Sequence, residues 1–222
     1  MKVITAWSGG KDSCLAYYKA AKSGLDVVSL VTFMQSEDTS NFHGIRADLL
    51  DGQAKSIGVP LAKKVTTPAT YEKVFKDTLL GFKVKGVTGI VTGDIYEVAQ
   101  HEEKWLERVC REVGYTPVRP LWQGNTTELF KEFIAAGFKA TVVRTKLAVL
   151  GKEWLGRELD AKFLADIQNV KGVDPCGEGG EYHTVVTDGP IFKQAICLLQ
   201  TEKTTKGEFG RLEISKFQVV KK

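Results

Sequence analysis

The sequence predicts an α/β fold, a doubly wound parallel sheet followed by a smaller C-terminal α+β domain. Two observations lead to this fold class. Short apolar runs alternate with helical stretches over the first 120 residues, which is typical of a parallel sheet covered by helices on both faces. After Pro120 the chain changes to two helices and four strands. We therefore expect two domains, residues 1–120 and residues 121–222.

Five strands and four helices are expected in the first domain. Glycines end the first two helices and favour the left-handed backbone found at helix C-termini. The last helix carries an apolar stripe at helical spacing, formed by Leu106, Val109, Cys110 and Val113. We place the strands at 2–7, 27–33, 61–65, 89–92 and around Val118, and the helices at 14–21, 45–57, 71–82 and about 97–113.

The second domain opens on a helix-start signal. Asn125, followed three residues later by Glu128, predicts an N-cap with a capping box for a helix that ends at Gly137. Further elements follow from alternation and periodicity, with a turn at Thr204–Gly207 joining the last two strands into a hairpin. These are a helix at 161–169 and strands at 139–145, 182–188, 194–201 and 211–220.

Composition limits the class of protein. A hydrophobic content of 43% can supply a real core, and the net charge of +4 divides evenly between the two halves, which gives no argument for nucleic-acid binding. The four cysteines form no CxxC pair, so neither a zinc site nor a disulfide framework is expected. With no signal peptide and no apolar run of membrane-spanning length, we expect a cytoplasmic protein without membrane contact.

A glycine-containing loop joins the first predicted strand to the first predicted helix. The glycines allow close backbone approach, and the helix N-terminus favours negative charge. Lys11 adds a mobile cation, and Asp12 adds a carboxylate able to hold a metal bound to phosphate. The GxxxxGK[ST] pattern is absent from the chain. We predict that this loop binds phosphate through Ser8, Gly9, Gly10, Lys11, Asp12 and Ser13.

Two more loops at strand ends are expected to line the same crevice. In parallel sheets ligands gather at the carboxyl ends of strands, near the point where strand order reverses. Thr32 and Phe33 end the second strand, where backbone groups would hold adenine, and His43 follows in the next loop. Gly93 and Asp94 end the fourth strand. For Asp94 the alternative is a cap on the following helix.

A second unusual stretch precedes the strand at 182–188. Residues 174–184 combine three glycines with the acidic side chains Glu178 and Glu181 and with His183. A plain turn would explain the glycines. The functional interpretation is a wall that binds substrate opposite the nucleotide. Within this stretch, Cys176 is expected to be a small buried hydrophobe rather than a reactive thiol.

The two motifs together resemble a known family. Ser-Gly-Gly-Lys-Asp-Ser resembles the PP-loop of the ATP pyrophosphatase superfamily, which has a HUP-like fold. Together with Gly-Glu-Gly-Gly-Glu-Tyr-His-Thr (177–184), Asp188-Gly189-Pro190 and Pro120-Leu121-Trp122, it resembles the diphthine–ammonia ligase family, in its compact archaeal-type form. The resemblance implies ATP- and Mg²⁺-dependent amidation of diphthine on translation elongation factor 2 to diphthamide, with release of AMP and pyrophosphate.

The residues suit that chemistry. Lys11 and Asp12, the latter through a Mg²⁺ ion, would offset charge on the leaving pyrophosphate. Glu178 and Glu181 are candidates for holding ammonium or removing its proton. His183 would steady the acceptor carboxylate or the α-phosphate. No glutaminase is recognisable, since Lys2 occupies the place of an N-terminal cysteine, so free ammonium is the expected nitrogen source.

Two alternatives stay open at this point. A PP-loop enzyme that modifies transfer RNA would adenylate a base, but the expected CxxC pair, rhodanese-like cysteine or basic extension is absent. A nucleotide-binding sensor of the same fold would not catalyse, and the retention of Lys11, Asp12 and Ser13 speaks against it. A homodimer is left open.

Overall fold

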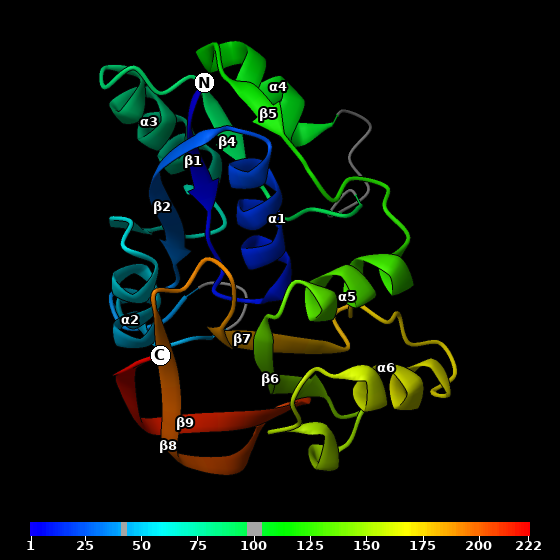
Figure 1. Ribbon diagram of the computed structural model, residues 1–222. Coiled ribbons are helices and arrows are strands. Elements are labelled where there is room, and N and C mark those ends of the chain that lie inside the picture. The colour runs from blue at the N-terminus through cyan, green and yellow to red at the C-terminus, as the bar shows by residue number, and fades with distance from the viewer. Residues whose placement is uncertain (41–43, 97–103) are drawn as a thin grey trace. The chain divides into compact units, whose positions relative to one another are not determined.

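A computed structural model describes residues 1–40, 44–96 and 104–222 (Figure 1). Contacts divide the chain into two compact units. The first contains Met1–Ser8, Asp12–Ala54 and Val59–Trp122. The second contains Gln123–Lys222 together with two short pieces from the first half, Gly9–Lys11 and Lys55–Gly58. The tip of the predicted phosphate loop therefore belongs to the second unit.

The first unit holds a five-stranded parallel sheet in the order β3-β2-β1-β4-β5. Its strands are β1 (Lys2–Ala6), β2 (Asp26–Met34), β3 (Leu61–Val65), β4 (Gly89–Val91) and β5 (Thr116–Val118). The connecting helices are α1 (Lys11–Lys22), α2 (Ala47–Ile57), α3 (Tyr71–Lys83) and α4 (Trp105–Val113).

The strand order makes this sheet doubly wound. The chain steps one way from β1 to β3, then returns across the sheet to β4 and β5. Since crossovers between parallel strands are right-handed, α1 and α2 cover one face and α3 and α4 the other. The predicted fold class is thereby confirmed. The order reverses between β1 and β4, so the carboxyl end of β1 lies at the switch point where such folds bind ligands.

The face covered by α3 and α4 contains a large apolar core. Strand residues Ile4, Val31 and Ile90 pack there against the apolar side of both helices. Burial of each large apolar side chain contributes on the order of 1.5–3 kcal/mol. The apolar stripe predicted for α4 is confirmed, because all four of its members are buried: Leu106, Val109, Cys110 and Val113.

One helix starts earlier than expected, and the expected start of another lies outside the described residues. Helix α1 begins at Lys11, earlier than the residue 14 expected, because Gly9 adopts a left-handed backbone (φ 78°) and the chain can turn into the helix at once. The expected start near residue 97 lies outside the described residues, as does His43. Within the described part, the helix begins at Trp105 and ends before left-handed Gly114 (φ 67°).

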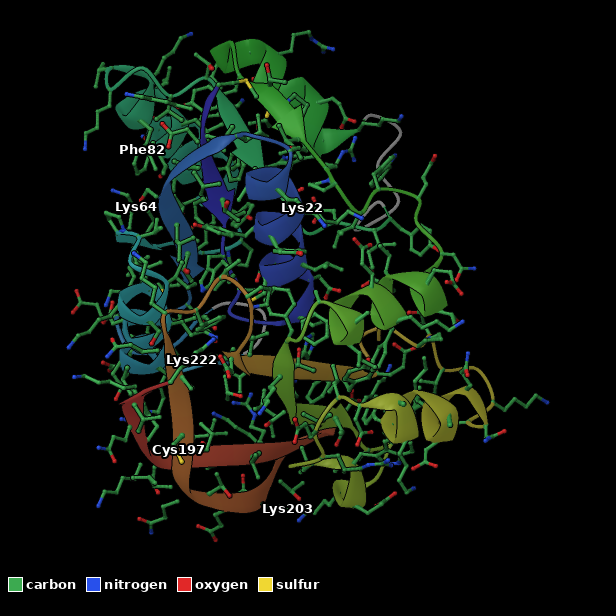
Figure 2. The ribbon with its side chains drawn as sticks, viewed as in Figure 1. Lys22, Lys64, Phe82, Cys197, Lys203 and Lys222 are labelled. Atoms are coloured by element: carbon green, nitrogen blue, oxygen red, sulfur yellow. The ribbon has the colours of Figure 1, made fainter. Side chains whose placement is uncertain are left out.

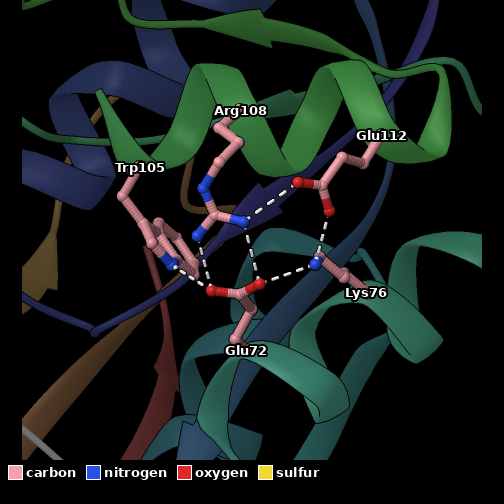
Figure 3. A network of polar contacts seen from close by, with 5 residues as sticks. All are labelled: Glu72, Lys76, Trp105, Arg108 and Glu112. Atoms are coloured by element: carbon pink, nitrogen blue, oxygen red, sulfur yellow. Dashed lines mark hydrogen bonds and ion pairs between the residues drawn. The ribbon is translucent and has the colours of Figure 1, made fainter. Parts of the chain in front are cut away.

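A network of ion pairs joins α3 to α4 on the protein surface (Figure 3). Arg108 donates to both carboxylate oxygens of Glu72, at 2.7 and 3.0 Å, and also reaches Glu112 at 3.0 Å. Lys76 bridges the same two glutamates, and the indole N–H of Trp105 donates to Glu72 at 3.0 Å. Hydrogen bonds from Arg108 and then Lys76 hold the pKa of Glu72 well below its ordinary value of 4.5.

This network predicts a pH-dependent contribution to stability. A carboxyl whose pKa is lowered by folding stabilises the protein above its unfolded pKa, and that contribution is lost as pH falls through the folded value. Glu72→Gln should therefore lower the free energy of unfolding at pH 7, with the difference from wild type shrinking below about pH 4.5. Urea unfolding across that pH range measures it. Asp77→Asn, which breaks an exposed pair with Lys73, is the control, and a pH-independent difference for Glu72→Gln would contradict the prediction.

The second unit holds a four-stranded antiparallel sheet in the order β7-β6-β9-β8, which confirms the α+β expectation. Helix α5 starts as predicted at its Asn125 cap, whose side chain accepts the Glu128 N–H at 3.1 Å. The strands are β6 (Lys139–Lys146), β7 (Tyr182–Asp188), β8 (Gln194–Lys206) and β9 (Phe209–Lys221), with helices α5 (Thr126–Ala135) and α6 (Ala161–Gln168) and the 3-10 turn η1 (Lys152–Trp154).

The hairpin turn between β8 and β9 lies later than expected. The strands continue to Lys206 and resume at Phe209, which are register partners, so the turn predicted at Thr204–Gly207 was wrong. A two-residue loop closes the hairpin, and Gly207 occupies its first position with φ 58°. Glycine is favoured there because the tight turn needs a left-handed residue.

The cysteines are free thiols. All four fall within the described residues and none forms a disulfide. Cys14, Cys110 and Cys176 are buried, whereas Cys197 on β8 is exposed (Figure 2). Burial raises the pKa of Cys110 to about 11. Among the described helices, none combines the length and apolar character that crossing a membrane requires.

Candidate functional site

The phosphate loop in the first unit is held by its own side chains and by β4. The hydroxyl of Ser8 donates to that of Ser13 at 3.1 Å, which ties the end of β1 to the first turn of α1. Gly93, after β4, packs on the backbone of Asp12: a Cβ there would lie 2.7 Å from the Asp12 carbonyl carbon. Any side chain at Gly93 would therefore displace the loop. The structure thus brings Gly93 against the loop that the sequence singled out.

The start of α1 and the turn after β4 each carry one half-buried carboxylate, Asp12 and Asp94, whose oxygens could ligate a metal ion. Burial, and then the negative charge of Asp94, raises the pKa of Tyr71 to about 12, so this phenol keeps its proton at neutral pH. The described residues contain no group of three or more metal-ligating side chains.

At the end of β2, the side chains of both predicted adenine-binding residues serve the fold. The Thr32 hydroxyl donates to the Trp7 carbonyl at 2.7 Å. Phe33 stacks on Phe75 with ring centroids 5.2 Å apart and is buried. Both side chains are therefore engaged within the first unit, and adenine binding by backbone groups near them stays a prediction.

In the second unit, the loop tip lies along the edge of β7. The Lys11 N–H donates to the Thr184 hydroxyl at 3.1 Å, and the Val186 N–H donates to the Gly9 carbonyl at 2.9 Å. The Lys11 ammonium lies 5.6 Å from the centroid of the Tyr182 ring. Two motifs far apart in sequence therefore meet at Thr184, whose hydrogen bond with Lys11 spans 173 positions.

Lys11 is more enclosed than a mobile cation would be, with only 5% of its surface exposed. Burying an ammonium group is costly unless negative charge or a π face compensates. The Tyr182 ring supplies part of that compensation. An enclosed cation beside a helix N-terminus is well suited to an incoming polyanion.

The loop that precedes β7 is organised around Asp174. Its carboxylate accepts the Cys176 N–H at 2.7 Å and the Thr126 hydroxyl at 2.8 Å. The Cys176 thiol is buried and donates to the Thr126 carbonyl at 3.2 Å, so the expectation of a buried small side chain is confirmed. Gly177 has φ 76°, and a Cβ there would lie 2.9 Å from the Tyr182 carbonyl oxygen.

The two candidate glutamates have different environments. Glu178 is exposed, whereas only 6% of Glu181 is exposed. Glu181 accepts the Asp174 N–H through Oε1 at 3.1 Å. Its other oxygen, Oε2, is buried and has no hydrogen-bond partner among the residues described. Gly179 leaves the space for this carboxylate, because a Cβ there would lie 2.7 Å from Oε1.

A buried carboxylate oxygen without a partner is unusual. Leaving a buried polar group without a hydrogen bond costs about 1–3 kcal/mol of folding free energy, and the cost is larger for a charged group. Glu181 therefore presents an acceptor that a donor from outside the chain could satisfy. Sequence reasoning named Glu181 and Glu178 equally, and only burial distinguishes them. It missed Thr184 and Asp174, for which the sequence offered no signal beyond their place in the glycine-rich stretch.

Comparisons with known proteins follow the same two-part division. The diphthamide synthase N-terminal domain matches residues 1–117, and the diphthamide synthase C-terminal domain matches residues 125–220. The chain belongs to the diphthamide synthase family. Both motifs described above, the phosphate loop and the loop before β7, fall inside the matched segments of this family.

Two curated mammalian relatives are similar over most of their length. The chain is 29% identical to the diphthine–ammonia ligase of Bos taurus, covering 92% of this chain and 85% of that protein. It is 28% identical to the diphthine–ammonia ligase of Homo sapiens, covering 91% and 84%. Among solved structures, a predicted subunit of tRNA methyltransferase from Methanocaldococcus jannaschii aligns with a TM-score of 0.48 and 17% identity over 85% of this chain and 98% of that one, a likeness too low to support an assignment.

Proposed function

We propose that this chain is a diphthine–ammonia ligase, which uses ATP to amidate diphthine on translation elongation factor 2. The matches of both halves to diphthamide synthase carry the proposal. The hydrogen bond from Lys11 to Thr184 supports it, because it joins the phosphate loop to β7, the strand that follows the loop bearing Glu178 and Glu181. Residues 1–120 would bind the nucleotide and residues 121–222 the acceptor, in a cytoplasm reducing enough for unpaired cysteines.

The reaction needs two steps because a carboxylate is a poor electrophile. In the first, a carboxylate oxygen of diphthine attacks the α-phosphorus of ATP, and pyrophosphate leaves with the electron pair of the broken bond. In the second, ammonia attacks the activated acyl carbon, AMP leaves, and a base takes one proton from nitrogen. The protein must therefore stabilise negative charge at one place and handle ammonium at another.

Charge on the phosphates would be met by Lys11 and by the first turn of α1. The N–H groups of a helix start point at an anion, and the dipole favours negative charge. Ser8 and Ser13 place two hydroxyl groups at the same turn. This arrangement holds donors in position before charge develops, which is the usual source of transition-state stabilisation.

Magnesium fits the oxygen donors of this site. Mg²⁺ in phosphoryl-transfer sites keeps several waters and takes only one or two protein carboxylates plus substrate phosphates, so a cluster of three ligating side chains is not required. Asp12 would hold the ion. Asp94, on the turn after β4, would be the second carboxylate. When bound, Mg²⁺ would offset charge on the phosphate oxygens.

The nitrogen source would be held by Glu181. Ammonium carries four N–H donors, and the buried Oε2 of Glu181 has no hydrogen-bond donor among the described residues. Binding there would satisfy the carboxylate and place a proton acceptor beside the nucleophile. The exposed Glu178 lacks this environment. His183, on β7 next to Tyr182, would steady the acceptor carboxylate or the α-phosphate.

One incubation tests the proposal. The protein is mixed with ATP, Mg²⁺, ammonium and diphthine-bearing elongation factor 2, and AMP release and the mass of the factor are followed. We expect AMP to form with the mass change of one amide, and glutamine not to replace ammonium. AMP formed only with transfer RNA would instead indicate an RNA-modifying enzyme. ATP binding without turnover on any acceptor would indicate a sensor.

A further inference from the structure

Three basic side chains lie in a row across the antiparallel sheet of the second unit. Arg144 on β6 is the register partner of His183 on β7 and of Arg211 on β9. Residues directly opposite each other in an antiparallel sheet point to the same face. His183, Arg144 and Arg211 are therefore neighbours on one face, and we call them the basic row. Lys146, two residues beyond Arg144, faces the same way.

An irregularity in β6 creates this row. The register shifts between Val142, which pairs with Thr184, and Arg144, which pairs with His183. The shift inserts one extra residue into β6. Without it, Val143 would lie opposite His183 and Arg144 would turn to the other face of the sheet. Bulges of this kind re-aim side chains and are frequent beside active sites. The bulge also lies next to Thr184, the residue that accepts the Lys11 N–H.

The two arginines of the basic row place like charges opposite each other on β6 and β9. Like charges directly opposite each other destabilise a sheet. The Arg144 guanidinium lies over the Phe209 ring at 3.7 Å, and burial, followed by the charge of Arg211, lowers the pKa of Arg144. The proximity of Arg211 therefore opposes the charged form of Arg144.

Arg211 itself lacks compensation. Its Nε is buried without a hydrogen-bond partner, and within the described ranges Arg211 forms no ion pair. Glu213 faces the same way two residues along β9, yet it accepts the Thr204 hydroxyl at 3.4 Å instead. A buried guanidinium N–H that is left unmet beside a second arginine fits an anion from outside the chain.

We propose that Arg211 and Arg144, together with His183, bind an oxyanion of a reactant, either the phosphate chain of the nucleotide or the acceptor carboxylate. This inference rests on the proposed ligase function for the identity of the reactants. Planar guanidinium groups bind carboxylate and phosphate oxygens through two parallel hydrogen bonds. The basic row begins at His183, two residues from Glu181, so the site would hold an anionic reactant near the residue that handles ammonium.

The test compares Arg211→Gln with Lys216→Gln, which removes one positive charge from an exposed position on the same strand. Calorimetry measures the affinity for inorganic pyrophosphate with Mg²⁺, and a pull-down titration measures the affinity for diphthine-bearing elongation factor 2. For Arg211→Gln we expect about a tenfold or greater loss for one of the two ligands, with Arg211→Lys recovering part of it. The melting temperature of Arg211→Gln should equal or exceed that of wild type, because a like-charge neighbour is removed.

The outcome identifies the ligand. Weaker pyrophosphate binding assigns the basic row to the phosphate chain, and weaker binding of the factor alone assigns it to the acceptor carboxylate. Unchanged affinity for both ligands would overturn the inference, and so would equal losses in the Lys216→Gln control. If wild-type protein fails to amidate the factor while Arg211→Gln still weakens pyrophosphate binding, the ligase proposal fails and the oxyanion site stands.

Discussion

Replacing Lys11 with alanine is expected to lower AMP formation by about 10²–10³-fold or more, the usual cost of removing a preorganised group that stabilises developing charge. The Lys11 ammonium is enclosed beside Tyr182. The fold should persist, because the Lys11 N–H that donates to Thr184 belongs to the backbone. Rates of AMP release at saturating acceptor and ammonium, together with thermal unfolding, measure both effects.

A matched control lies on the same helix. Lys22→Ala removes an exposed lysine from the last turn of α1 (Figure 2), and its AMP release should equal that of wild type. If Lys11→Ala kept wild-type AMP release while folding normally, the phosphate loop would have no role for its cation, and the adenylation mechanism would have to be abandoned.

The second large effect concerns Glu181. Glu181→Gln should slow amide formation by about 10²–10⁴-fold, the range supplied by a positioned acid or base, while leaving ATP binding unchanged. The amide keeps an oxygen for the Asp174 N–H but places an NH₂ group where the unpartnered Oε2 lies. An NH₂ group repels ammonium and cannot take its proton.

The measurement is amide formation as a function of ammonium concentration, with ATP affinity determined separately. Glu178→Gln is the natural comparison, because Glu178 is an exposed glutamate on the same loop, and we expect less than a threefold effect from it. Wild-type amidation by Glu181→Gln would remove this residue from the mechanism. A large loss in Glu178→Gln alone would move the ammonium role to Glu178.

Local signals in the sequence were sufficient for most elements. The strands predicted at 61–65 and 182–188 coincide with β3 and β7, because glycine and proline residues bound both short segments in the sequence. The N-cap at Asn125 was predictable for the same reason, since the bond it makes spans only three residues. The start of α1 was misplaced because the left-handed backbone of Gly9 lets the helix begin immediately.

The candidate site was predictable only as two separate motifs. Glycines, hydroxyls and a lysine after a strand indicate a phosphate loop without any knowledge of the fold. Nothing in the sequence tells Glu181 from Glu178, because burial depends on what packs around each residue. Arg144 and Arg211 carry no motif and are 67 positions apart in the numbering; their pairing depends on strand order and on one extra residue in β6.

By itself, the sequence determined the succession of strands and helices, the glycine-containing loop after the first strand and the family resemblance, because these depend on neighbours within a few residues. The tertiary structure decided that Lys11 meets Thr184, that Glu181 keeps a buried oxygen without a partner, and that two arginines face each other across β6 and β9. These features arise from strand register and burial, which are set by contacts between segments far apart in the chain, and no local pattern encodes them.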